Sequence, residues 1–280
     1  MPDLPLPTYK IGSHISQPTR TGDRDPRGIL WLWEEPQDHA AYCIACDPTV
    51  GIPNWSRAMR SGSDHKTDNA AIEVIRIGSQ GQPDVQVAEF AAPIPPIELA
   101  PILNHIGRLF CGSNEEGEGH IIIEVYPGPG LLLQHELMSR YGYGNVYQPR
   151  YLNTRNAQVP RTQPYGWTAT KQSVTDLWVM GLHHINNHRA LVRSEWLIDE
   201  MANCVRDEGT MQLKAAYGNH DDRVRAFLLA LWAGRDWAGM WTEDTGPVEN
   251  VSVPDWQRSS ISLRDMMSQA AERFSDLLDD

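Results

Sequence analysis

The chain has 280 residues and a formal net charge of −12, which is enough length for one large domain or two small ones. The acidic balance excludes a general polyanion-binding protein, so any DNA-binding surface has to be local. No apolar run is long enough to cross a bilayer, and the first residues lack the charged and then apolar pattern of a signal peptide, so we expect an intracellular protein without membrane contact.

The first predicted core strand ends on an acid. Residues 1–27 are rich in Pro, Gly, Thr and Arg without periodicity, which predicts a tail or linker, and residues 28–33 predict a short entering strand. Residues 42–47 are an apolar run that ends at Asp47, and Pro48 prevents its extension. A carboxylate at the end of a central strand lies where ligands collect in α/β folds; the alternative is an Asp that only starts a turn.

Two of the four cysteines, Cys43 and Cys46, have CxxC spacing. No second pair or neighbouring His completes a zinc-binding set, and residues three apart on a strand point to opposite faces. We therefore expect small core residues in a reducing compartment.

The next strands are predicted to pair with the first. Residues 70–77 alternate apolar and polar side chains, which indicates a half-buried strand, and residues 85–90 follow a turn as a third strand. Together they predict an antiparallel meander with one solvent-exposed face. Pro96 suits the first turn of a helix that ends near residues 111–112.

A second acid ends a second apolar run. Residues 120–124 (HIIIE) are typical of a strand buried on both faces, and the run ends at Glu124. Gly128 then opens a helix. The remaining predicted elements are helices over residues 173–187, 194–206 and 223–232, an extended segment over 211–217 and, within a C-terminal tail of residues 241–280, a last amphipathic helix over 262–278.

Residues 137–175 contain no Asp or Glu, in contrast to the rest of this acidic chain. Basic side chains alternate there with aromatic ones, which suits a surface that follows phosphates and stacks on sugars or bases. The candidates for DNA contact are Arg150, Arg155, Arg161, Trp167 and Lys171. The alternative is a Tyr-rich loop packed on the core.

The candidates for a metal centre are Asp47, Glu124 and the pair Asp221 and Asp222, which precedes the apolar stripe of the helix over residues 223–232. Acids at a helix N-terminus are also favoured simply as caps. Converging carboxylates cannot all stay ionised without a cation, and oxygen ligands suit Mg²⁺ or Mn²⁺. Two such ions, about 3.5–4 Å apart, would activate a water and stabilise the leaving oxygen of a phosphodiester.

Two further residues are candidates for supporting roles. His220 can orient a ligand or the leaving group, although a His before a helix is more often a capping or surface residue. Asp68 can support the ligands, although a solvated loop acid is the commoner role. His184 and His188 lack the Glu of HExxH, and no GxxxxGK[ST] sequence occurs, which excludes a P-loop ATPase.

The succession of strand-Asp, two meander strands, helix, strand-Glu, helix and a helix that opens with His-Asp-Asp resembles the ribonuclease H-like fold, an α/β architecture with a mixed five-stranded sheet flanked by helices. Several short segments of the sequence resemble segments of the C-terminal nuclease domain of the large terminase subunit of tailed bacteriophages. The similar phrases are YCIACDPTVG (42–51), DNAAIEVI (68–75), IIIE (121–124), YGWTAT (165–170) and GNHDD (218–222), with GILWLWEEP (28–36) at the entry. Their order places the domain at residues 28–240.

The resemblance implies a metal-dependent endonuclease that cuts concatemeric double-stranded DNA during phage genome packaging, in the cytoplasm of the infected bacterium. Asp47, Glu124 and Asp221 or Asp222 would bind Mg²⁺ or Mn²⁺. The implied partners are DNA, an ATPase motor, the small terminase subunit and the portal. The family's motor is absent from this sequence, which implies an excised domain or a separate motor chain, and residues 125–128 (VYPG) depart from the Asn-rich segment common in the family.

Two alternatives stay open. A Holliday-junction resolvase or a transposase of the same fold would use the same acids on a different substrate. A non-catalytic binding or assembly module would keep the fold without metal-dependent cutting.

Overall fold

A computed structural model describes residues 30–52, 55, 68–78, 81–112, 114, 117–126, 128–149, 165–206 and 213–237. The strands are β1 (Leu30–Leu32), β2 (Tyr42–Asp47), β3 (Ala70–Arg76), β4 (Asp84–Ala92), β5 (His120–Tyr126), β6 (Trp167–Thr168), β7 (Ala190–Leu191), β8 (Cys204–Arg206) and β9 (Leu213–Ala215). The helices are α2 (Pro96–Leu109), α3 (Pro129–His135), the π-helical turn η1 (Glu136–Arg140), α4 (Lys171–Asn186), α5 (Glu195–Ala202) and α6 (Asp222–Trp237).

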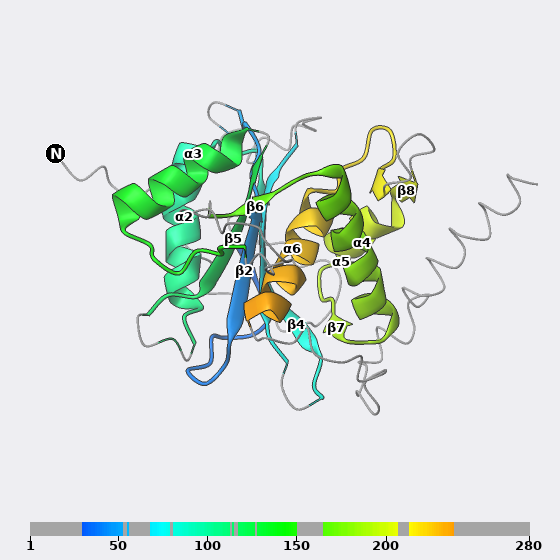
Figure 1. The fold of residues 1–280 in the computed structure, drawn as a ribbon, viewed down its shortest axis with the longest axis horizontal. Helices are drawn as coiled ribbons and strands as arrows, with labels where there is room; N and C mark the ends of the chain where they lie inside the picture. Colours follow the sequence, from blue (N-terminus) through cyan, green and yellow to red (C-terminus); the bar gives the residue numbers. More distant parts are fainter. Residues whose placement is uncertain are drawn as a thin grey trace, which may run out of the picture.

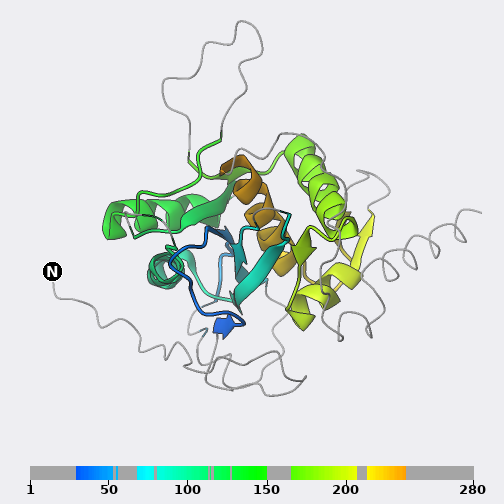
Figure 2. The same ribbon diagram turned by 90° about the horizontal axis from the view of Figure 1, so that it is seen from below.

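A mixed sheet forms the middle layer, in the order β1-β4-β3-β2-β5-β6, with β7 also paired to β4. Strands β2, β3 and β4 are the expected antiparallel meander, and β5 returns parallel to β2 after α2. Helices α2 and α3 cover one face and α4, α5 and α6 cover the other (Figures 1 and 2). The α/β class with a mixed, helix-flanked sheet is therefore confirmed. The described sheet has seven strands instead of five, since the short β1 and β7 both pair with β4.

The expectation that the meander has one solvent-exposed face is wrong. Every residue from Ala70 to Ile75 is buried, and Glu73 is 0% exposed. The polar residues of the alternation pair with one another instead of with water, because Gln86 Nε2 donates to Glu73 Oε2 over 2.7 Å. Alternation therefore located the strand correctly, whereas the environment of its polar face was decided by the helices packed over it.

Helix α5 is shorter than the sequence predicts. It is capped by Ser194, whose side chain accepts from Leu197 N, and it ends at Ala202 instead of Arg206. Asn203 closes it by donating from Nδ2 to the Asp199 carbonyl oxygen over 2.7 Å. The next residues form β8 and pair antiparallel with β9.

Helix α6 brings polar side chains to the sheet edge. Val224, Phe227, Leu228 and Leu231 are buried on it, and the helix packs on β2 and β3, as its apolar stripe predicts. Its first residue is Asp222, so the acids before the stripe lie at the N-terminal end of a helix that is held firmly against the centre of the sheet.

Cys43 and Cys46 are free and fully buried, and they belong to the cores on opposite faces of the sheet, as expected. No described helix is both long and apolar enough to cross a membrane. The tail predicted at residues 1–27 and the helix predicted at 262–278 lie outside the described residues.

Candidate metal centre

Two of the predicted acids lie side by side at one edge of the sheet. Strands β2 and β5 run parallel with Cys46 opposite Ile123, so Asp47 and Glu124 are the next residues on adjacent strands. Glu124 is 7% exposed, and the side chain of Asp47 is 15% exposed. The two carboxylates lie together because Asp47 ends β2 and Glu124 follows the apolar run of the paired strand β5.

An arginine that the sequence analysis did not single out lies between them. Arg225 Nε is 3.2 Å from Asp47 Oδ2 and donates over 3.2 Å to Glu124 Oε2. A terminal nitrogen of the same guanidinium also pairs with Glu124 Oε1. The sequence gives no direct signal for these pairs, because Asp47 and Glu124 are distant from Arg225 along the chain.

Asp221 and Asp222, at the N-terminal end of α6, both contribute to the raised pKa of Asp47. Burial raises the pKa of Asp47 well above its ordinary value, and repulsion from Glu124, Asp222 and Asp221 adds to the shift. Burial also raises the pKa of Glu124, against the opposing effect of Arg225 and with further repulsion from Asp221. Each of these like charges disfavours ionisation of the others.

We call Asp47, Glu124, Asp221 and Arg225 the strand-end cluster. Asp221 is held in it by the backbone, because Asp221 Oδ2 accepts from Ala215 N over 3.3 Å. Two carboxylates, Asp47 and Glu124, share the single guanidinium of Arg225, so ionisation of both leaves one negative charge uncompensated, and Asp221 adds to it. A divalent cation bound here would supply the balancing charge.

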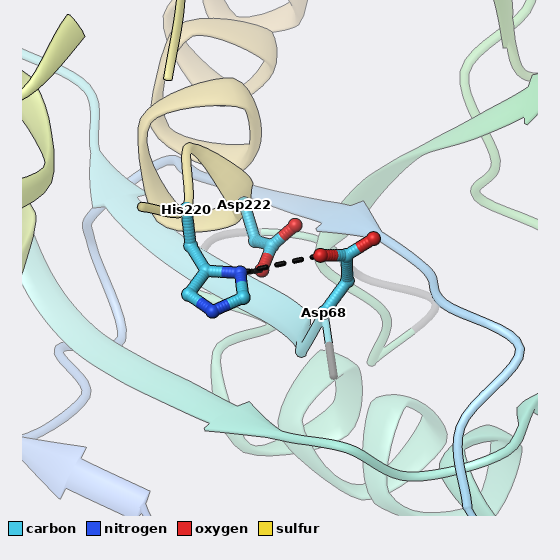
Figure 3. Close-up of side chains that lie close together, drawn as sticks. All are labelled: Asp68, His220 and Asp222. Atoms are coloured by element: carbon cyan, nitrogen blue, oxygen red, sulfur yellow. Dashed lines mark hydrogen bonds and ion pairs between the residues drawn. The ribbon is translucent and has the colours of Figure 1, made fainter. Parts of the chain in front are cut away.

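Asp222 points to a second group, which we call the loop cluster: Asp68, His220 and Asp222 (Figure 3). One ligand atom from each of the three residues lies within 4.8 Å of the others. His220 Nδ1 is 3.2 Å from Asp68 Oδ1 and 3.8 Å from Asp222 Oδ2, and Asn69 N donates to Asp222 Oδ2 over 2.9 Å. Burial raises the pKa of Asp222 to about 7.

The donors present fit divalent cations. The strand-end cluster offers only carboxylate oxygens, which suit Mg²⁺ or Mn²⁺. The loop cluster adds an imidazole nitrogen, which suits Mn²⁺ better than Mg²⁺. The two clusters are neighbours along the chain, because Asp221 belongs to one and the next residue, Asp222, to the other.

The close approach of a glycine to β5 helps to fix the position of Glu124. Gly130, near the start of α3, lies so close to β5 that a Cβ on it would be 1.8 Å from the Glu124 carbonyl oxygen and 2.7 Å from Val125 Cα. Any side chain at this position would therefore displace the strand that carries Glu124. Gly130, two residues after the Gly128 that the sequence analysis placed at the helix start, thus supports the position of an acid in the strand-end cluster.

No family model matches the chain, and no curated protein matches it. Among solved structures, the nuclease domain of the large terminase of Thermus phage P74-26 is similar, with a TM-score of 0.47 and 16% identity over 74% of this chain and 86% of that domain. The fold resembles that of a phage terminase nuclease domain. This is the family that the segments named in the sequence analysis resemble. At 16% identity the similarity carries no information about chemistry, which has to be argued from the residues described above.

The residues expected to contact DNA fall into three groups. Trp167 is 4% exposed and belongs to the core, so its ring is not available to stack on a base, and that expectation is corrected. Lys171 is exposed at the first residue of α4, and its contact with DNA stays a prediction. Arg150, Arg155 and Arg161 lie outside the described residues.

Proposed function

We propose that this protein is a divalent-metal-dependent endonuclease that hydrolyses phosphodiester bonds of double-stranded DNA. The observation that carries the proposal is the adjacency of Asp47 and Glu124 on the parallel strands β2 and β5, where both pair with the single guanidinium of Arg225 and Asp221 adds further negative charge. Bound Mg²⁺ or Mn²⁺, in one or two positions, would activate a water and stabilise the leaving oxygen.

The side chains of the protein would hold the metal ions and orient the reacting groups. Asp47 and Glu124 are fixed by paired strands, so their oxygens keep their positions without reorganisation, which favours catalysis. His220 is oriented by Asp68 and Asp222, whose oxygens lie 3.2 Å and 3.8 Å from its Nδ1, and the ring would bind or transfer a proton at the leaving oxygen. Burial on the strands excludes water from the inner side of the cluster.

The biological role that we propose is the cutting of concatemeric DNA in phage genome packaging, as part of a large terminase. The support is the order of the phrases at residues 42–51, 68–75, 121–124, 165–170 and 218–222. In this role the protein acts in the cytoplasm of the infected bacterium, with an ATPase motor, a small terminase subunit and the portal as partners.

One observation favours a second candidate, a non-catalytic module of the same fold. Arg225 already pairs with both Asp47 and Glu124, and a permanent counter-ion of this kind would make a metal unnecessary. This candidate predicts that the protein never cuts DNA and that neutralising Asp47 leaves DNA binding unchanged.

The test is plasmid cleavage by the full chain. We expect nicking or linearisation of supercoiled plasmid with Mn²⁺ or Mg²⁺, none with EDTA, and a loss of rate of about 10²–10³-fold in Asp47→Asn, which is typical when a group acting in the transition state is removed. Asp176→Asn, at an exposed position of α4, is the matched control and keeps the rate. Absence of cutting with every divalent ion tried would favour the non-catalytic module, and faster cutting of four-way junctions than of linear duplex would favour a resolvase.

A further inference from the structure

Arg225 holds a position that a shared cation would also take. Its Nε is 3.2 Å from an oxygen of Asp47 and 3.2 Å from an oxygen of Glu124, so one group links the two strand ends. Its own side chain is 26% exposed. The guanidinium is therefore held by the acids on its inner side and open to solvent on another, which gives it somewhere to move.

The backbone at Arg225 is fixed, whereas its side chain is partly exposed. Arg225 N donates to the Asp221 carbonyl oxygen over 2.8 Å in the first turn of α6. The helix is anchored on the sheet by Val224 and Leu228, which are 0% and 1% exposed. Displacement of the guanidinium thus needs only rotation of the side chain, on the timescale of rotamer changes.

We propose, on the basis of the metal-dependent function proposed above, that Arg225 is a built-in competitor of the metal ion. The guanidinium neutralises Asp47 and Glu124 in the metal-free protein and has to leave them before a divalent cation binds between the strands. Two ligands that exclude each other from the same acids weaken each other's binding. Arg225 therefore lowers the affinity of the strand-end cluster for free cations and keeps the nuclease inactive until the metal concentration is high enough to displace it.

The test measures metal binding in the absence of DNA and of cutting. Mn²⁺ is titrated calorimetrically into the metal-free full chain, in the wild type and in Arg225→Gln, which retains polar character but removes the charge. We expect Arg225→Gln to bind Mn²⁺ about tenfold or more tightly, within the range of about 5–150-fold that is usual for coupling between two ligands. Unchanged or weaker binding overturns the inference.

Three further variants make the result specific. Arg108→Gln removes a guanidinium that pairs with Glu118 at 3.1 Å on the other face of the sheet, and it should bind Mn²⁺ as the wild type does. Asp47→Asn combined with Arg225→Gln should lose the gain, which locates it in the strand-end cluster; retention of the gain overturns the inference.

Arg225→Lys decides the question if Arg225→Gln does not fold. A lysine ammonium cannot reach two carboxylates with the forked geometry of a guanidinium, so it competes less well, and we expect Mn²⁺ affinity to rise by a smaller factor than in Arg225→Gln. Equal binding by wild type and Arg225→Lys then overturns the role of Arg225 alone. Absence of Mn²⁺ binding in the wild type and in every variant overturns the metal-dependent function together with this inference.

Discussion

Two arginines in the first turns of helix α6 lie two residues apart, and each joins a pair of acids. Arg223 pairs with Glu89 at 3.0 Å and Glu200 at 2.5 Å, whereas Arg225 pairs with Asp47 and Glu124. Their side chains are similarly enclosed, with 18% and 26% exposed. Charge pairing and burial alone therefore do not distinguish a structural cluster from a functional one.

The Arg223 cluster, formed by Arg223, Glu89 and Glu200, differs from the strand-end cluster in its position and its exposure. Glu89 lies within β4 opposite Glu73 of β3, and these two acids are 1% and 0% exposed. Glu200 also accepts from the Arg223 backbone N over 2.9 Å. Asp47 instead is the last residue of β2, and its side chain is 15% exposed. We infer that the Arg223 cluster stabilises the fold, while the strand-end cluster can be reached by a ligand.

The strongest way to break this distinction is to neutralise one acid in each cluster. We expect Glu124→Gln to lower the rate of metal-dependent DNA cutting by about 10²–10³-fold, because a ligand of the ion is lost. Glu200→Gln should leave the rate per folded molecule within about threefold and lower the free energy of unfolding by about 2 kcal/mol, since a hydrogen bond to a charged group is lost. Plasmid cleavage and urea unfolding of the same samples check both, and reversed effects would exchange the roles of the clusters.

The arginines themselves sharpen the comparison. Arg223→Gln leaves Glu89 and Glu200 buried without a counter-ion, so we expect the free energy of unfolding to fall by about 3–5 kcal/mol. Added Mn²⁺ should not restore the loss, because no ligand site lies in the Arg223 cluster. Arg225→Gln should be destabilised in EDTA and recover with Mn²⁺. Thermal unfolding with and without Mn²⁺ makes the measurement, and equal recovery in both variants would contradict the distinction.

The pH dependence of stability isolates the Arg223 side of the comparison. Burial raises the pKa of Glu73 well above its ordinary value of 4.5, and repulsion from Glu89 adds to it. Since the folded-state pKa is raised, the contribution of Glu73 to stability is complete below pH 4.5 and is lost as the pH rises through the folded value. Glu73→Gln cannot ionise, so we expect it to unfold less readily than the wild type at pH 8, by about 1 kcal/mol, and to show no advantage at pH 4. A difference that does not change with pH in urea titrations would contradict this.

How far the sequence predicted the site depends on which kind of residue is considered. Asp47 and Glu124 were predictable because each ends an apolar run, and runs of that kind pair at the centre of a sheet. Arg225 was not singled out, because its partners are acids distant in the sequence. The burial of Glu73 was missed for the same reason: alternation identifies the two faces of a strand and says nothing of what covers them.

The smallest predicted effect concerns the basic and aromatic residues within 137–175, where the structure has already shown that Trp167 is buried. Trp167 packs in the core, which supports the packed-loop alternative at that position. Lys171, four residues later, is exposed. If Lys171 contacts a phosphate, Lys171→Ala should weaken DNA binding only several-fold, but it should reduce the slope of log K against log salt by about 0.9, because one fewer counter-ion is released. Lys214→Ala, which changes an exposed lysine on β9, is the matched control and should leave the slope unchanged. If the slope is the same in the wild type and in both variants, Lys171 does not contact a phosphate, and the packed-loop interpretation extends from Trp167 to Lys171.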